Sequence, residues 1–258
     1  MVSQLQSTTV TYPDSDGQPM SDNTKQFRWI VVVQQNFEWL YADEPTVFVA
    51  GDLLWYPVEG NNKIRTAPDI FIAFGRPKGD RGSYQQWKEA NIPPQIVFEI
   101  LSPGNRKTEM EKKLLFYERH GVEEYYLYNP DTNGLEGWIR TEGYLENIDS
   151  LENWVSPRSR IRFDLSGDEL QIFRPDGDRF LSYTEIAQQA EQSKLEAEQS
   201  KLEAEQSKLE AEQSKLEAEQ EKQRAVQLEG ELERERSRSQ ALLDRLRAAG
   251  IDPTELNP

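Results

Sequence analysis

Residues 94–128 read PQIVFEILSPGNRKTEMEKKLLFYERHGVEEYYLY, and this stretch decides the fold. Its first part, Gln95–Leu101, is a short apolar run bounded by proline, which is typical of a strand. Lys107–His120 then has helical spacing and stops before Gly121, a residue that commonly closes helices. Glu124–Tyr128 is a second short run rich in aromatic residues. A strand, a helix and a strand in succession predict an α/β core.

Other short runs, apolar and bounded by Pro, Gly or Asp, predict further strands. Those upstream are Val47–Ala50, Leu53–Tyr56 and Ile70–Phe74. Those downstream are Gly137–Arg140, Ile161–Leu165 and Leu170–Arg174, and they indicate an antiparallel extension of the sheet. A first helix is predicted over Thr24–Leu40, with Thr24 as its N-cap.

The sequence changes character near Tyr183, where a long helical segment begins. The unit AEQSKLE occurs four times in succession over residues 190–217. A seven-residue period is typical of supercoiled helices, but glutamine would fill the a positions if the leucines took the d positions, so association would be weak. A solvated single helix held by Glu–Lys pairs remains the alternative. The better-spaced leucines of the last part are the predicted dimer contact: Leu228, Leu232, Leu242 and Leu246.

These shifts in composition predict four segments. Residues 1–22 form a loose N-terminal arm, residues 23–186 the globular domain, residues 187–249 the helical tail and residues 250–258 the C-terminal end.

The composition excludes several kinds of chemistry. The 258 residues include no cysteine and one histidine, His120, so disulfides, thiolate nucleophiles and two-histidine metal sites cannot form within the chain. No signal peptide or long apolar run is present, and we expect a cytoplasmic protein without membrane association. The net charge of −16 argues against broad, sequence-blind binding to nucleic acid. Hydrolytic chemistry would therefore depend on carboxylates and lysine.

Three features follow one another in a suggestive order. Asp69 opens a strand after proline, Glu99 lies inside an apolar strand, and Lys112 and Lys113 follow in the next helix. Two carboxylates can bind a divalent ion such as magnesium, and a lysine can orient water or stabilise the charge of a transition state. Ordinary explanations exist for each: Asp69 could serve turn formation, Glu99 could face solvent by strand alternation, and the lysines could be exposed charges.

The motifs PDIFIAF, PPQIVFEILSPGNR and EMEKKLLFYERHGVEEYYLYNP together resemble the Uma-type "putative restriction endonucleases", a bacterial branch of the PD-(D/E)XK nuclease superfamily. The resemblance is strongest from Val47 to Arg140 and looser from Thr24 to Tyr183. It implies a four-stranded mixed sheet flanked by helices, a divalent metal held by Asp69 and Glu99, and cleavage of DNA phosphodiester bonds.

One position departs from the general superfamily pattern. The lysine expected two residues after the second acid is replaced by Leu101. The family branch is thought to carry this lysine on the following helix, which matches Glu109, Lys113 and Tyr117. At about 100° per residue, Lys113 lies at the edge of the face expected to pack on the sheet, and Lys112 points away from it.

Three hypotheses about function follow. The first is an endonuclease that cleaves DNA with Mg²⁺ or Mn²⁺, using Asp69 and Glu99 as metal ligands and Lys113 as the third catalytic residue. The second is a catalytically degenerate nuclease fold that serves as a binding module. The third is a coiled-coil scaffold that forms a homodimer through the C-terminal helix.

Overall fold

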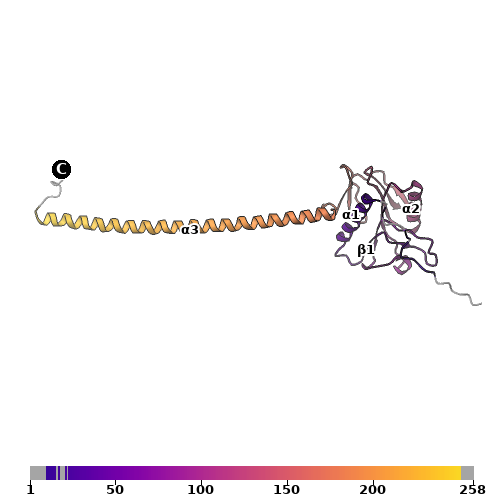
Figure 1. The fold of residues 1–258 in the computed structure, drawn as a ribbon, viewed down its shortest axis with the longest axis horizontal. Helices are drawn as coiled ribbons and strands as arrows, with labels where there is room; N and C mark the ends of the chain where they lie inside the picture. The colour runs from indigo at the N-terminus through magenta and orange to yellow at the C-terminus, as the bar shows by residue number, and fades with distance from the viewer. Residues whose placement is uncertain (1–9, 16, 18–20, 22, 251–258) are drawn as a thin grey trace, which may run out of the picture. The chain divides into compact units, whose positions relative to one another are not determined.

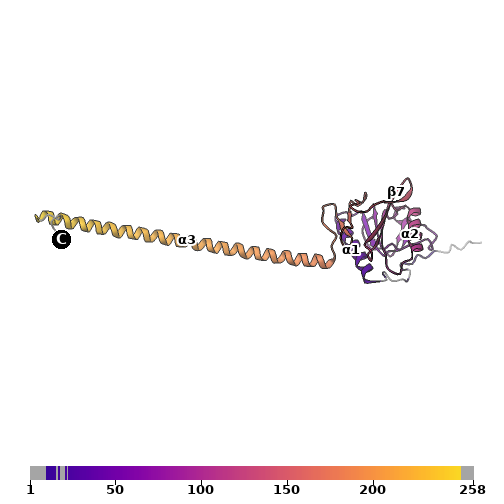
Figure 2. The same cartoon turned by 90° about the horizontal axis from the view of Figure 1, so that it is seen from above.

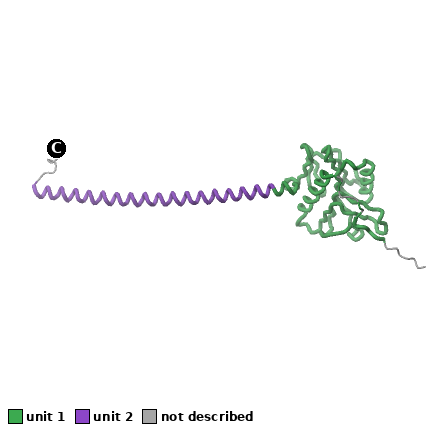
Figure 3. Tube along the Cα trace, in the orientation of Figure 1, with its two compact units in different colours: residues 1–187 green, residues 188–258 purple. Residues whose placement is uncertain are grey.

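The structure is a computed structural model that describes residues 10–15, 17, 21 and 23–250. It divides into two units, residues 1–187 and residues 188–258 (Figure 3). Most of the stretch expected to form the N-terminal arm, and most of the expected C-terminal end at residues 250–258, lie outside the described residues. Within the arm, Tyr12 packs its ring against Tyr56, whose hydroxyl donates to the Pro13 carbonyl over 2.7 Å.

A six-stranded mixed sheet forms the centre of the first unit, in the order β1-β3-β5-β6-β7-β8. The strands are β1 (Val47–Gly51), β3 (Ile70–Phe74), β5 (Ile96–Ile100), β6 (Glu124–Asn129), β7 (Gly134–Thr141) and β8 (Tyr144–Asn147). β5 and β6 are parallel, and the other neighbours are antiparallel. The parallel pair requires a crossover, which is the helix between the two strands.

The expectation of four strands is therefore wrong, because β7 and β8 extend the sheet beyond β6 as a hairpin. The turn of this hairpin places Glu142 at φ 50° and Gly143 at φ 97°. Positive φ at both central residues is typical of the tight turns that match the twist of two antiparallel strands.

Two helices cover opposite faces of the sheet, as Figure 1 and Figure 2 show. α1 (Thr24–Leu40) packs its buried Ile30, Val33 and Phe37 against one face. α2 (Lys107–His120) packs Met110 and Tyr117 against the other. Because side chains alternate along a strand, β5 turns Phe98 and its even-numbered neighbours toward α1, and its odd-numbered residues toward α2.

The ends of these helices follow local rules. The N-cap of α1 is Asn23 and not Thr24, because the Asn23 side chain accepts a hydrogen bond from the Gln26 amide over 2.8 Å. α2 ends at Gly121 with φ 95°, in the left-handed conformation that glycine adopts at low cost, so this predicted C-cap is confirmed.

Smaller elements complete the unit. β2 (Trp55–Tyr56) and β4 (Tyr84–Gln85) form a short parallel pair, followed by a 3₁₀ turn, η1 (Gln86–Lys88). β9 (Arg162–Asp164) and β10 (Gln171–Phe173) pair as a hairpin that packs Phe163 and Ile172 into the core beneath α1.

The third helix, α3 (Tyr183–Ala248), is continuous over 66 residues. It begins at a capping box, in which the Ser182 amide donates to the Glu185 carboxylate over 2.8 Å and the Glu185 amide donates back to the Ser182 hydroxyl. The four leucines of the repeat are 57–63 % exposed. Among the described residues, no helix is long and apolar enough to cross a membrane.

Candidate metal and phosphodiester site

Asp69 lies immediately before β3 and is buried between neighbouring strands. Its Oδ2 atom accepts a hydrogen bond from the Ile100 amide over 2.7 Å, which ties the start of β3 to the end of β5. Burial raises the pKa of the Asp69 carboxyl well above its ordinary value, and the negative charge of Glu99 raises it further. The position of Asp69 therefore favours the protonated form of its carboxyl group in the absence of a cation.

Glu99 occupies the middle of β5 on the face covered by α2. The residue is only 2 % exposed, so the alternative in which it faces solvent is wrong. Its Oε2 atom accepts a hydrogen bond from the Lys113 ammonium over 2.8 Å, and its Oε1 atom accepts one from the Tyr117 hydroxyl. A buried carboxylate requires such partners, because an unpaired charge inside a protein is strongly unfavourable.

Lys113 reaches the carboxylates from the middle of α2. Burial alone would lower the pKa of its ammonium, but the charges of Glu99 and then Asp69 outweigh that effect and raise the pKa above its ordinary value. Its side chain is 21 % exposed. Lys112, the preceding residue, is exposed. The helix thus brings one lysine of the pair to the site and leaves the other outside it.

Three other acids, Asp52, Glu38 and Glu109, have different positions in the structure. The Asp52 amide donates to the Asp69 carbonyl over 3.1 Å, and the charge of Asp52 raises the pKa of Asp69. Glu38 on α1 pairs with Lys78 over 3.6 Å. Glu109, one turn before Lys113, is exposed. Of these three acids, Asp52 is the one that contacts Asp69 and contributes to its pKa.

The sequence analysis assigned no role to the Tyr117 hydroxyl, which the structure places in contact with Glu99. The signal was available, because Tyr117 follows Lys113 by one helical turn and therefore shares its face. Ser102 has the local role that turn formation suggests: its amide donates to the Asn105 side chain over 2.8 Å.

The donor set fits a hard divalent ion. Magnesium and manganese take oxygen ligands, commonly one or two carboxylates with water and phosphate oxygens completing the shell. Within residues 10–15, 17, 21 and 23–250, no group of three or more His, Asp or Glu side chains is placed to hold an ion. Asp69 and Glu99 would thus supply only part of a coordination shell, as expected for an ion that shares its ligands with a substrate.

Comparison with known proteins identifies a family. The family model Uma2, described as "Putative restriction endonuclease", matches residues 17–166, more than half of the chain. The chain is also similar to the crystal structure of "a putative nuclease belonging to DUF820 from Anabaena variabilis ATCC 29413", with a TM-score of 0.41 and 18 % sequence identity, covering 54 % of this chain and 74 % of that one. The search of curated proteins found no match. The matched residues include Asp69, Glu99, α2 and the six-stranded sheet. The chain therefore belongs to the Uma2 family of restriction endonuclease-like proteins.

Proposed function

We propose that this protein is an endonuclease that hydrolyses DNA phosphodiester bonds with a divalent metal ion, Mg²⁺ or Mn²⁺. The observation that carries the proposal is the convergence of two buried carboxylates and one lysine, from two strands and a helix. Asp69, Glu99 and Lys113 are separated in sequence, yet the charges of both acids act on the Lys113 ammonium. Asp69 and Glu99 would hold the ion, which would supply a Lewis acid that activates water and offsets negative charge on the phosphate.

The protein's own residues would divide the remaining work. Asp69 and Glu99 would present their oxygens to the ion, with Asp69 held by the Ile100 amide and Glu99 by the Tyr117 hydroxyl. Lys113 would turn its ammonium toward a phosphate oxygen and stabilise the charge that builds up during attack. Preorganised partners of this kind keep the carboxylates in place before substrate binds.

The helix-borne lysine replaces the lysine of the general pattern. Leu101 lies on the same face of β5 as Glu99, where a strand lysine would stand. Lys113 approaches that face from α2, and its ammonium is 2.8 Å from Glu99. A long, flexible side chain can run along apolar surface and deliver its charge at the end. A lysine on α2 would therefore bring the same positive charge to Glu99 as a lysine on the strand.

Substrate binding would depend on local cations, because the chain as a whole carries a net charge of −16. Arg106 and Lys107 stand at the N-terminus of α2, shortly after the strand that carries Glu99. Helix N-termini and basic side chains both favour phosphate groups. We place the reaction in the cytoplasm, which fits the absence of cysteine from the sequence.

Nicking of supercoiled DNA tests this function. The intact protein should cut with Mg²⁺ and should leave the DNA uncut in the presence of a chelator. Asp69→Asn and Glu99→Gln should each abolish cleavage with the fold retained, because each removes an anionic oxygen at nearly constant shape. The double change Glu146→Gln and Asp149→Asn, at two exposed acids, is the matched control. Cutting by the double Asp69→Asn, Glu99→Gln variant would overturn the proposal.

A further inference from the structure

A cavity of about 430 Å³ lies beside the candidate site, between α2 and strands β5, β6 and β7. Two of its lining residues lie next to Glu99, one along the chain and one on the adjacent strand. Leu101 is two residues further along the same face of β5, and Leu127 is the partner of Glu99 in the register of β5 and β6. The cavity therefore adjoins Glu99 on the face of the sheet that α2 covers. Its volume is within the usual range of pockets for small organic groups.

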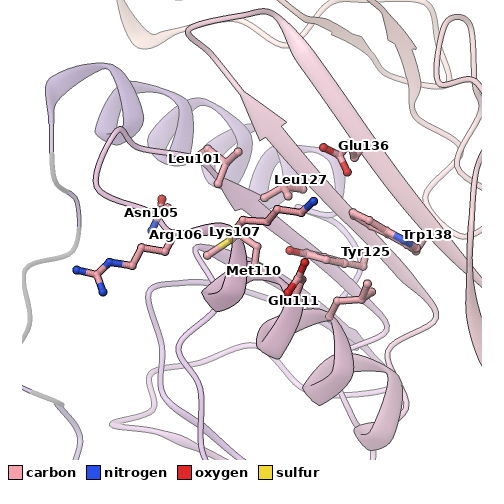
Figure 4. Close-up of a pocket in the computed structure, with 11 residues that line it drawn as sticks. Leu101, Asn105, Arg106, Lys107, Met110, Glu111, Tyr125, Leu127, Glu136 and Trp138 are labelled. Carbon is pink, nitrogen blue, oxygen red and sulfur yellow. The ribbon is translucent and has the colours of Figure 1, made fainter.

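The side walls of this cavity are suited to a flat aromatic ring. Trp138 is partly exposed, and its indole stacks on the Tyr125 ring with centroids 4.9 Å apart and planes 17° apart. Met110 and Leu114 of α2 line the opposite side. Figure 4 shows Trp138 and Tyr125 on the side of the strands, with Met110 facing them from the helix.

One polar group in the cavity is without a partner. The Tyr125 hydroxyl is buried and has no hydrogen-bond partner in the part of the chain that the structure describes. Nearly all buried polar atoms of folded proteins are paired, so an unpaired one requires an explanation. Burial, and then the charges of Glu99 and Asp69, raise the pKa of Tyr125 well above its ordinary value, so its hydroxyl keeps its proton. Tyr125 is 0 % exposed, so a ligand in the cavity reaches this donor only when the side chains over it move apart.

Four charged side chains line the cavity, and all four belong to exposed residues. Lys107 extends across the cavity toward β7, and Arg106 points away from it at the outer rim (Figure 4). Glu111 and Glu136 contribute carboxylates to the lining. Lysine and arginine side chains favour a phosphate, whereas carboxylates disfavour phosphate and accept hydrogen bonds from amines. Carboxylates form such bonds with the exocyclic amine of cytosine in protein–DNA complexes.

We propose that this cavity, the base pocket, receives one unpaired nucleobase of the strand being cut, stacked beside Trp138, and that the side chains over the Tyr125 hydroxyl move apart so that the base accepts a hydrogen bond from it. The adjacent phosphate would lie toward Lys107 and the metal site. The preferred substrate is then DNA that is single-stranded or locally opened, since a paired base cannot enter a pocket without leaving its stack. Glu136 favours a base with an exocyclic amine, which every DNA base except thymine carries. This inference rests on the proposed function for the identity of the polymer as DNA.

Binding, measured apart from cleavage, tests the pocket. Fluorescence anisotropy would compare a labelled single-stranded oligodeoxycytidine, an oligodeoxythymidine of the same length and a duplex, with the full chain in Ca²⁺. Tyr125→Phe removes only a hydroxyl that has no partner, so the variant should fold normally. Trp138→Ala removes the stacking surface. Trp39→Ala, at a tryptophan on α1 that is 51 % exposed, is the matched control.

We expect the deoxycytidine strand to bind about tenfold or more tightly than the duplex. Trp138→Ala should remove about tenfold of that affinity, the scale of one base–aromatic stack, and Tyr125→Phe several-fold, while Trp39→Ala changes neither. The deoxythymidine strand should bind more weakly than the deoxycytidine strand, and Glu136→Gln should remove the difference.

Equal affinity for single strand and duplex, or unchanged single-strand affinity in both Tyr125→Phe and Trp138→Ala, would overturn the base pocket. The two proposals fail separately. A protein that binds single strands through Trp138 but never cuts them retains the pocket and loses the nuclease function. A protein that cuts duplex DNA with no effect of Tyr125 or Trp138 retains the nuclease function and loses the pocket.

Discussion

Glu99 is a carboxylate in the middle of a buried strand, and its two oxygens accept hydrogen bonds from Lys113 and Tyr117. The Asp69 carboxylate accepts a hydrogen bond from one backbone amide, and the negative charge of Glu99 raises the pKa of Asp69. The single ammonium of Lys113 therefore faces two acids. At the scale of the residue, two acids share one ammonium, and a divalent cation would supply the positive charge that allows both acids to ionise.

Lys113→Met should reduce turnover by about 100-fold or more, the scale of losing one preorganised donor to the transition state. Magnesium binding should persist, because both carboxylates remain. Single-turnover cleavage at saturating magnesium measures the effect, and the exposed Lys112→Met is the control that should be nearly silent. Leu101→Lys in the Lys113→Met background should restore part of the rate. Equal losses in the two single variants would contradict the assignment of Lys113.

Asp69→Asn should stabilise the metal-free fold at neutral and alkaline pH. The folded state holds the pKa of Asp69 well above its ordinary value of 3.8, so the folded protein keeps a proton that the unfolded chain releases. Stability of the natural protein must then fall as the pH rises from about 4 through the folded pKa. Asparagine keeps an acceptor for the Ile100 amide and carries no charge.

Thermal melting in the presence of a chelator, from pH 4 to pH 8, measures this difference. The melting temperature of Asp69→Asn should exceed that of the natural protein by a margin that grows with pH and disappears near pH 4. The remaining charges around the site, Glu99, Lys113 and Asp52, are the same in both proteins. A melting temperature at pH 8 that is equal to or below that of the natural protein would contradict the prediction.

At the scale of the element, α2 positions the site because both of its ends are defined. It begins after the turn that follows β5, and it ends at Gly121, which returns the chain into β6. The crossover places Lys113 and Tyr117 above Glu99 because β5 and β6 are parallel neighbours. A shift of the helix by one residue would rotate it by about 100° and turn Lys113 away from the acids.

Gly121→Ala should therefore destabilise the domain by about 1–2 kcal/mol or more, the cost of an L residue in the left-handed conformation plus a steric term. A Cβ atom at Gly121 would lie 3.1 Å from Pro93. Gly177→Ala is the matched control, because Gly177 has a similar φ of 93° with nothing within 4 Å of the added carbon. Urea unfolding of both variants should show a larger loss for Gly121→Ala; equal losses would exclude the contact with Pro93.

At the scale of the whole molecule, the chain joins a globular unit to a helix whose leucines are exposed. None of the side chains described in α3 is buried. Gln192 donates to Glu196 within the helix, and Gln199 to Glu203 likewise, so part of its stability is local. We propose that α3 forms a homodimer contact through its C-terminal leucines; a solvated single helix is the alternative.

Truncation after Ala187 tests this role. The truncated protein should have a lower particle mass than a dimer of the full chain. Its cleavage rate per site should be similar to that of the full chain, because Asp69, Glu99 and Lys113 all precede Ala187. Light scattering across a range of protein concentrations measures the first quantity, and the nicking assay measures the second. A full-length protein that is monomeric at all concentrations would disprove the dimer contact.

The sequence by itself determined the local features of this protein. The bounds of α1 and α2, the left-handed Gly121 and the start of β3 at Ile70 all follow from periodicity, turn residues and caps, which depend on neighbours along the chain. The candidate acids could be selected because a charge inside an apolar strand is unusual in any fold.

Only the tertiary structure decided which strands are neighbours and which side chains contact one another. The Tyr117 hydroxyl on Glu99, the place of Asp52 near Asp69 and the unpaired hydroxyl of Tyr125 depend on which strands are neighbours and in which register. The sequence of a strand shows which side chains alternate between its two faces, but it does not show which strand pairs with it. The pairing of β5 with β6 and the addition of β8 could therefore not be read from their residues. The physical reason is that strand pairing is non-local: its hydrogen bonds join residues far apart in sequence, and a shift by one residue would exchange the two faces of the sheet.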